Sequence, residues 1–195
     1  MNRLILASRS PRRCELLHNL GIPFTAEAFD VDETCCLPAP EAVELISLRK
    51  AEAARRKYPD SYILSADTLV SYHGSSLGKP VDEDDASRML RLLSGSTHQV
   101  YTGVTVISPD GQSFTSHDCS NVTFDSLSEN EITSYIRSGE PMDKAGSYAI
   151  QGRAALWISR MDGSPSSVIG LSLYLVRSLL LQSGYPLDDV LEKQQ

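Results

Sequence analysis

The stretch that decides the fold is LILASRSPRRCELLHNLG, residues 4–21. Leu4–Ala7 is an apolar run that predicts a short buried strand, and helix-start signals follow it directly. Ser10 suits an N-cap position, Pro11 suits the first helical position, and Gly21 is typical of a residue just past a helix end. The stretch therefore predicts a strand, a tight junction and a helix, which together form the opening unit of an α/β fold.

The rest of the chain alternates apolar runs with amphipathic segments, as α/β proteins do. Further strands are predicted over residues 61–66 and 69–72, separated by Asp67, and over 99–107, 113–124 and 154–160. Further helices are predicted over residues 40–58, 82–93, 128–139 and 168–182. The polar tail from Pro186 is expected to be frayed. Because no linker interrupts this order, we expect residues 1–195 to form a single two-lobed domain.

The composition excludes several classes of protein. The chain has 195 residues, of which 41% are hydrophobic and 22% charged, and these values exclude wholesale disorder. The net charge is −7, from 25 acidic and 18 basic side chains. A nucleic-acid polymer or an anionic membrane favours basic surfaces, so neither is expected as a partner. A small anion can still bind in a local basic pocket.

Two further features indicate the compartment. The four cysteines form no CxxC pair, which favours a reduced setting, and the first residues lack the apolar core of a signal peptide. The apolar stretch 168–181 contains Arg177 and several serines, and it is too short and too polar to span a bilayer. We therefore expect a cytoplasmic protein.

The first candidate for chemistry is the segment SRSPRR, residues 8–13, between the first strand and the first helix. Such junctions point backbone N–H groups at a ligand above the helix start. Arg12 and Arg13 fall in the first helical turn, where the helix dipole disfavours cations. With Ser8 and Ser10, these side chains suit a phosphate chain. The alternative is that the serine only caps the helix and the arginines are solvated.

Two acidic segments are further candidates. Asp67 in SADT, residues 65–68, ends an apolar run and would lie at the carboxyl edge of the sheet, where α/β folds place ligands. A carboxylate there suits Mg²⁺ or Mn²⁺, or a general base acting on water. The alternative is that Asp67 caps a turn. Glu33 belongs to the acidic segment DVDET, residues 30–34, which either supplies metal ligands or forms a solvated loop.

Three lysines are candidate anion ligands. Lys50 shares the spacing of Ala42, Ile46 and Ala54, so it falls on the apolar stripe of its helix and either snorkels or reaches into a cleft. The other two, Lys79 in a Gly-Lys-Pro turn and Lys144 in a glycine-bounded loop, are plain surface residues when taken singly. A cluster of these cations would explain how an acidic protein attracts a polyanion.

The segment DKAGSYAIQG, residues 143–152, combines glycines with Gln151. Glycine permits close approach of the backbone, and a glutamine side chain offers both a donor and an acceptor. That pair of functions suits recognition of the edge of a nucleobase. The alternative is an ordinary glycine-punctuated loop that leads into a strand.

Taken in order, the motifs SRSPRR, DVDET, SADT, GKP, LSGSTHQVYTGV and DKAGSYAIQG resemble the Maf family of nucleoside triphosphate pyrophosphatases, over residues 4–181. The resemblance implies a mixed, elongated and twisted α/β sheet flanked by helices, with two lobes around a deep central cleft, similar to inosine-triphosphate pyrophosphatase. It implies hydrolysis of a nucleoside triphosphate to the monophosphate and pyrophosphate, with Mg²⁺ or Mn²⁺ as the divalent metal.

The resemblance also implies roles for individual residues. It places the proton acceptor at Asp67, further catalytic groups at Lys50, Lys79 and Glu33, and substrate selection at Arg12, Thr68 and Gln151. Whether Asp67 is a base, a metal ligand together with Glu33, or both stays open. The expected substrate-binding residues are Ser8, Ser10, Arg12, Arg13, Thr68, Lys144 and Gln151. These assignments require Arg13 and Asp67 to face one shared cavity.

The segment DKAGSYAIQG looks like the branch of the family that hydrolyses dTTP and UTP, with modified pyrimidine nucleotides as further substrates. The alternatives are a 7-methyl-GTP pyrophosphatase or a non-hydrolysing nucleotide-binding regulator of septum formation. The resemblance implies a homodimer with a house-cleaning role. One departure is Ser172, where the family usually has proline. The absence of this proline is expected to loosen the start of the last helix.

Overall fold

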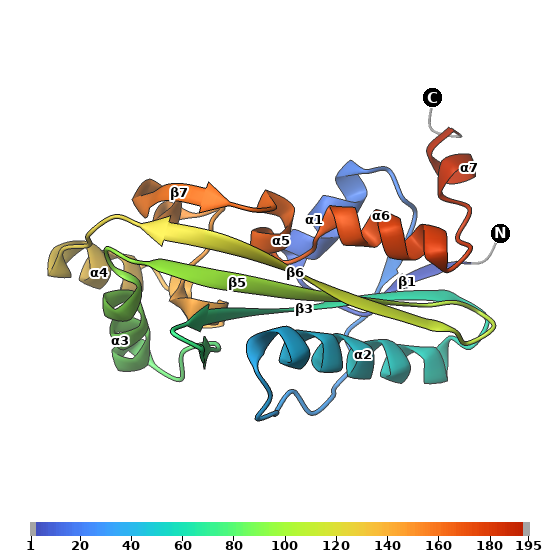
Figure 1. Cartoon of the computed structure of the whole chain (residues 1–195), viewed down its shortest axis with the longest axis horizontal. Helices are drawn as coiled ribbons and strands as arrows, with labels where there is room; N and C mark the ends of the chain where they lie inside the picture. Colours follow the sequence, from blue (N-terminus) through green and yellow to red (C-terminus); the bar gives the residue numbers. More distant parts are fainter. Residues whose placement is uncertain (1–2, 193–195) are drawn as a thin grey trace.

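One mixed sheet of seven strands organises residues 3–192, the part of the chain that the computed structural model describes (Figure 1). The strands are β1 (Leu4–Leu6), β2 (Thr25–Ala26), β3 (Tyr62–Tyr72), β4 (Ser75–Leu77), β5 (Thr97–Ile107), β6 (Ser113–Phe124) and β7 (Ile158–Asp162). The order across the sheet is β2-β1-β3-β5-β6-β7, and β4 pairs with β3. Strand β1 is parallel to β2 and β3, and the other pairs are antiparallel. The predicted mixed α/β sheet is confirmed.

The first four helices begin close to the predicted positions. The helices are α1 (Pro11–Asn19), α2 (Ala39–Lys57), α3 (Glu83–Leu93), α4 (Glu129–Ile136), α5 (Pro165–Ile169), α6 (Leu173–Gln182) and α7 (Leu187–Glu192), with 3₁₀ helices η1 (Glu140–Asp143), η2 (Ala145–Ser147) and η3 (Arg153–Trp157). Asp82 caps α3 by accepting from Asp85 N at 2.8 Å. Ser128 and Glu131 form the predicted capping box of α4.

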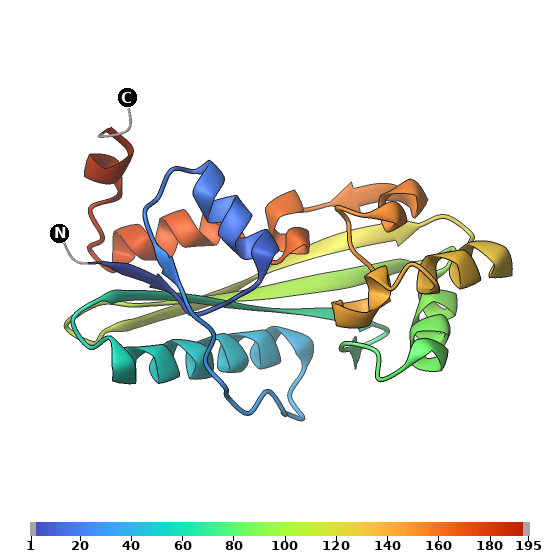
Figure 2. The same cartoon turned by 180° about the vertical axis from the view of Figure 1, so that it is seen from behind.

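Helices cover both faces of the sheet at the end where the two chain termini lie (Figures 1 and 2). Helix α2 lies on one face, and its sheet-facing Ala51 and Ala54 pack with Ile5 and Ile63. Helices α1, α5 and α6 lie on the opposite face, where α6 contributes a second set of buried residues: Leu175, Val176, Leu179 and Leu180. Helices α2 and α6 bury their apolar stripes against the sheet, which is the main source of stability for such layers.

The opposite end of the sheet carries a separate core. Helices α3 and α4 pack there with Phe124 of β6 and with Tyr148 and Trp157, whose rings make edge-to-face contacts with Phe124. Strands β3, β5 and β6 are long enough to take part in both ends, so one elongated sheet joins two separately packed regions (Figure 1).

Strand β3 does not end at Asp67, and this prediction was wrong. Residues 62–72 form one continuous strand, because antiparallel pairing with β5 runs unbroken through Asp67, which lies opposite Gly103. On the other edge of β3, pairing with β1 ends at Leu64 and pairing with β4 begins only at Val70. Among the strands of residues 3–192, residues 65–69 therefore pair with β5 alone, and their other edge is open.

The predicted helix over 168–182 is also wrong, since it is two helices. Gly170 adopts φ +127°, a conformation open to glycine, and breaks the chain between α5 and α6. Ser172 then caps α6 by accepting from Leu175 N and donates to Asp118 Oδ2 at 2.8 Å, so a serine cap replaces the expected loose start. No helix within residues 3–192 has both the length and the apolar character needed to cross a membrane.

Two boundaries near the carboxyl terminus also differ from the prediction. The expected strand 154–160 is a 3₁₀ helix, η3, up to Trp157 and a strand only from Ile158, because Ala154 and Trp157 turn inward to fill the core. The tail from Pro186 is helical over α7, where Leu187 and Val190 are buried against the α6 core. Residues 193–195 of that tail lie outside the described part, as do residues 1–2.

Gly103 sets how closely α2 approaches the sheet. A Cβ at this position would overlap the Val43 carbonyl group of α2, so only glycine lets the helix backbone lie directly on β5. Lys50 lies two turns further along the same helix face. The position of the Lys50 side chain at the open edge of β3 therefore depends on the close contact between Gly103 and α2.

We predict that Gly103→Ala lowers the free energy of unfolding by about 1–3 kcal/mol, since the backbone of α2 cannot move away cheaply. The matched control is Gly78→Ala, where a new Cβ meets nothing within 4 Å and the change should stay within about 0.5 kcal/mol. Urea unfolding of both variants measures the difference. Equal stabilities would contradict the close packing of α2 on β5.

Candidate functional site

A cavity of about 730 Å³ opens along the unpaired edge of β3, between the two packed regions. Its size falls in the range of about 300–1,000 Å³ that is typical of small-molecule sites. The predicted site residues all line it: Ser8, Ser10, Arg12, Arg13, Glu33, Lys50, Asp67, Thr68, Lys79, Lys144 and Gln151. The structure thus brings together side chains from both ends of the chain, and Arg13 and Asp67 share one cavity as required.

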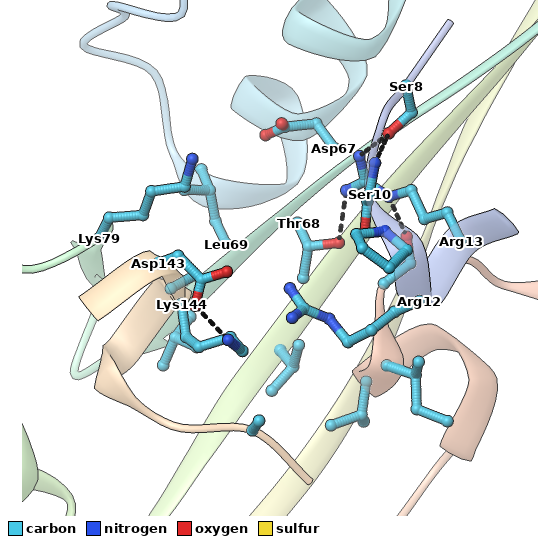
Figure 3. A pocket seen from close by; sticks show the side chains of 18 of the residues that line it. Ser8, Ser10, Arg12, Arg13, Asp67, Thr68, Leu69, Lys79, Asp143 and Lys144 are labelled. Atoms are coloured by element: carbon cyan, nitrogen blue, oxygen red, sulfur yellow. Dashed lines mark hydrogen bonds and ion pairs between the residues drawn. The ribbon is translucent and has the colours of Figure 1, made fainter. Parts of the chain in front are cut away.

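The charge lining the cavity is opposite in sign to the charge of the whole protein. Six cationic side chains line it (Arg9, Arg12, Arg13, Lys50, Lys79 and Lys144) against three anionic ones (Glu33, Asp67 and Asp143). The net local charge of +3 contrasts with −7 for the chain. Figure 3 shows Arg12 and Arg13 entering from α1, on the side away from Lys79 and Lys144. Such a cavity attracts a compact polyanion.

The amino terminus of α1 faces this cavity. Ser10 occupies the predicted N-cap position, but its side chain makes no capping hydrogen bond, and no acidic residue lies in the first turn. Its backbone N–H instead donates to Ser8 Oγ at 3.1 Å, which shapes the junction. The positive end of the helix dipole is thus left for an anion to occupy.

Arg13 is held in place by three different parts of the fold. Its guanidinium donates to the Gly170 carbonyl at 2.7 Å, and to Ser8 Oγ and Thr68 Oγ1 at 3.4 Å each (Figure 3). Burial lowers the pKa of Arg13, while the neighbouring Asp67 charge opposes that shift. Thr68 is itself hydrogen bonded to Thr102 at 3.0 Å. The cation is therefore oriented before any ligand arrives.

Lys50 joins the two predicted acids. Its Nζ lies 2.7 Å from Glu33 Oε1 and 2.7 Å from Asp67 Oδ1, and only 12% of its side chain is exposed. Of the two alternatives for this lysine, the structure shows the one that reaches into a cleft. The approach is possible because α2 packs closely over β3 and β5, next to the open edge.

The two carboxyl groups differ in their tendency to ionise. Burial raises the pKa of Asp67 above its ordinary value, and the charges of Lys50 and Arg13 offset only part of that rise. For Glu33, burial also raises the pKa, but the hydrogen bond and charge of Lys50, together with Lys79 and Arg13, outweigh it and hold the pKa low. Two carboxyl groups whose pKa values are shifted in opposite directions suit different roles in proton transfer.

The donor set fits a divalent cation only if a ligand shares the coordination. Within residues 3–192, no group of three or more His, Cys, Asp or Glu side chains is placed to hold a metal ion. Glu33 and Asp67 nevertheless converge on one point, the ammonium of Lys50. Mg²⁺ is commonly held by one or two carboxylates, with phosphate oxygens and waters completing its shell. The residues present fit that arrangement, and the metal stays a prediction.

The opposite wall comes from two linked loops. Gly146 N donates to the Gly78 carbonyl at 3.0 Å, which ties the loop of Lys79 to the loop of Lys144. Gly146 has φ +67°, and a side chain there would overlap Val70. Lys144 Nζ pairs with Asp143 and also donates to the Glu140 carbonyl at 3.3 Å. Gln151 lies in the turn that follows and also lines the cavity.

Sequence reasoning missed several residues of the cavity. The predicted site residues do not include Asp143 and Tyr148 of the segment 143–152, or Phe29, which precedes the acidic segment. Tyr148 is buried, and its hydroxyl lies 2.7 Å from His98 Nε2, a pairing between distant residues that only folding reveals. A continuous helix over 168–182 would hydrogen bond the Gly170 carbonyl internally, so the sequence did not predict its contact with Arg13. The glycine at position 170 was the sequence signal for a helix break there.

Comparison with known proteins agrees with this picture. A family model described as Maf-like protein matches residues 3–183. A protein of Symbiobacterium thermophilum named dTTP/UTP pyrophosphatase is 47% identical over 190 residues, covering 96% of this chain and 97% of that protein. A protein of the same name from Geobacillus sp. strain WCH70 is 49% identical over 175 residues, covering 89% and 94%.

Among solved structures, the Staphylococcus aureus Ham1 protein is similar with a TM-score of 0.52 and 13% identity, and the match covers 100% of both chains. At that identity the likeness concerns the fold alone. The family match extends over nearly the whole described chain and includes every residue that lines the cavity. The chain belongs to the Maf family, as the ordered motifs in its sequence predicted.

Proposed function

We propose that this protein hydrolyses dTTP and UTP to the nucleoside monophosphate and pyrophosphate. The observation that carries the proposal is the single cavity in which a helix start, a cluster of cations and a Lys50-bridged pair of carboxyl groups face one another. The names of relatives at 47% and 49% identity support the choice of substrates. The expected homodimer, the cytoplasmic location and action on modified pyrimidine nucleotides stay predictions.

Cations from two walls of the cavity are assigned to bind the triphosphate. Arg12 and Arg13, at the start of α1, approach from one wall, and Lys79 and Lys144 approach from the other (Figure 3). A triphosphate carries about four negative charges, and oriented guanidinium and ammonium groups stabilise the charge that gathers on departing pyrophosphate. Since Arg13 is already fixed by three hydrogen bonds, it loses little freedom when substrate binds.

Asp67 is assigned as the proton acceptor. A water oxygen attacks the α-phosphorus, the bond from phosphorus to the bridging oxygen of the β-phosphate breaks, and the water proton moves to Asp67. Lys50 occupies Oδ1, so we assign Oδ2 as the accepting oxygen. The raised pKa of this buried carboxyl makes it a better base than an exposed aspartate. Lys50 keeps the group oriented by donating to it.

Asp67 and Glu33 are the residues that would hold Mg²⁺ or Mn²⁺, which when bound would polarise phosphate oxygens and lower the pKa of a bound water. Glu33 suits this role because its low pKa keeps it ionised. Gln151 and Thr68 are assigned to base recognition. Hydrogen-bonding groups of this kind reject a base that leaves them unpaired by several kcal/mol.

With Mg²⁺ or Mn²⁺, the protein should release pyrophosphate from UTP and dTTP with a higher kcat/KM than from CTP, GTP or 7-methyl-GTP, and a chelator should stop the release. The measurement is a nucleotide panel with product analysis. A preference for 7-methyl-GTP would move the protein to the other branch, and binding without turnover would favour the non-hydrolysing regulator.

Asp67→Asn should lower kcat for UTP by at least about 10²-fold while the protein still folds, because the amide cannot accept the water proton. Steady-state kinetics and circular dichroism check the two parts. Asp162→Asn, which changes an exposed carboxylate on β7 of the same sheet, is the matched control and should keep wild-type rates. Wild-type turnover by Asp67→Asn would remove Asp67 from the mechanism.

Arg13→Ala should lower kcat/KM for UTP by about 10–100-fold, whereas Arg9→Ala should lower it less than about threefold. Both arginines line the cavity, but Arg9 is exposed and Arg13 is half-buried and held by hydrogen bonds. The two variants carry the same change in net charge. Equal losses would indicate attraction by general surface charge in place of an oriented phosphate contact.

A further inference from the structure

Gln151 lies in a turn whose position depends on other residues. Its side chain is exposed and, within the described part of the chain, makes no hydrogen bond of its own. The turn from Ala149 to Gly152 is closed by Gly152 N donating to the Ala149 carbonyl at 3.1 Å. An exposed glutamine can discriminate between bases only if its backbone is held still, because small displacements weaken oriented contacts.

Two side chains outside the motif hold both ends of this turn. Ala149 N donates to the Tyr135 hydroxyl at 3.3 Å. The same hydroxyl donates to Glu140 Oε1 at 2.9 Å, and Arg153 N donates to Glu140 Oε1 at 3.1 Å. A hydroxyl and a carboxylate therefore bracket Gln151 from Ala149 to Arg153.

The packing beneath the turn agrees with this arrangement. A Cβ at Gly152 would overlap the Glu140 carboxylate, so the carboxylate fills the space of a side chain at that position. Tyr135 is buried and its ring packs edge-to-face on Trp157 at 4.9 Å between centroids. Burial, reinforced by the bond to Glu140, raises the pKa of Tyr135, so its hydroxyl stays protonated and able to donate.

Glu140 also reaches the phosphate side of the cavity. Its backbone carbonyl accepts from Lys144 Nζ at 3.3 Å, so the cation and the base-recognition turn are joined through one residue. A side-chain substitution at position 140 leaves that carbonyl in place. The carboxylate and the carbonyl can thus be separated by experiment.

We propose that Glu140, together with Tyr135, is a positioning residue for base selection, which fixes the Ala149–Gly152 turn so that Gln151 can discriminate between bases. This inference rests on the proposed pyrophosphatase function. Tyr135 and Glu140, which lie outside the segment 143–152, then contribute to substrate choice but not to the proton transfer at Asp67.

The test compares wild type, Glu140→Gln, Gln151→Ala and the double variant on UTP and CTP. Glutamine keeps the shape of Glu140, but its amide nitrogen cannot accept, so the second bond from Arg153 N, to Oε2 at 3.3 Å, is lost. The bonds from Tyr135 and Arg153 to Oε1 also lose the strength that a carboxylate charge gives them. Glu140→Gln should lower the ratio of kcat/KM for UTP over CTP by about tenfold, mainly through KM for UTP. In the Gln151→Ala background, the same substitution should change the ratio less than about twofold.

Two further variants separate positioning from general stability. Tyr135→Phe keeps the buried ring but removes the hydroxyl, and it should lower the ratio in the same direction as Glu140→Gln. Glu131→Gln weakens the capping box of α4 and should lower Tm without changing the ratio. An unchanged ratio in Glu140→Gln, or an equal fall in the Gln151→Ala background, would overturn the positioning role. Absence of UTP hydrolysis by wild type would instead overturn the proposed function.

Discussion

The buried carboxyl group of Asp67 is the constraint on which the site depends. A carboxylate with only 8% of its residue surface exposed is costly unless cations compensate it. Lys50 contacts it directly, and Arg13 lies close enough to influence its ionisation. Gly103, opposite Asp67 in the sheet, lets α2 approach and bring Lys50 within reach. Without these neighbours, the group would gain a proton and could not take the proposed role of base.

The open edge of β3 explains how one strand serves two walls of the cavity. Successive side chains of a strand point to opposite faces, so Asp67 meets Lys50 on the α2 side and Thr68 meets Arg13 on the α1 side. Between paired strands these two positions would be separated by the sheet. Because no described strand pairs with residues 65–69 on one edge, a single ligand can contact both. The proposed proton acceptor and the proposed base-recognition residue Thr68 are thereby placed together.

The predictions that failed share a physical cause. Asp67 seemed to end a strand because a charged residue interrupted an apolar run, but cross-strand pairing with β5 overrides that local signal. The apolar stretch 168–181 favours one helix, yet the chain breaks at Gly170, whose carbonyl accepts from Arg13, 157 residues away in sequence. Leu187 and Val190 are ordered by contacts with a distant core. In each case, long-range pairing or packing accompanies the departure from the local sequence pattern.

The amino-acid sequence by itself determined the α/β class, the long strands β5 and β6, the starts of α1 to α4, the caps of α3 and α4, and the family. These follow from periodicity, capping chemistry and ordered motifs, which are local properties of the chain. Only the tertiary structure decided that Lys50 bridges Glu33 and Asp67, that β3 has an open edge, and that Tyr135 and Glu140 hold the turn of Gln151. Those features join residues far apart in the sequence, and their geometry is set by strand register and helix packing, which no local pattern encodes.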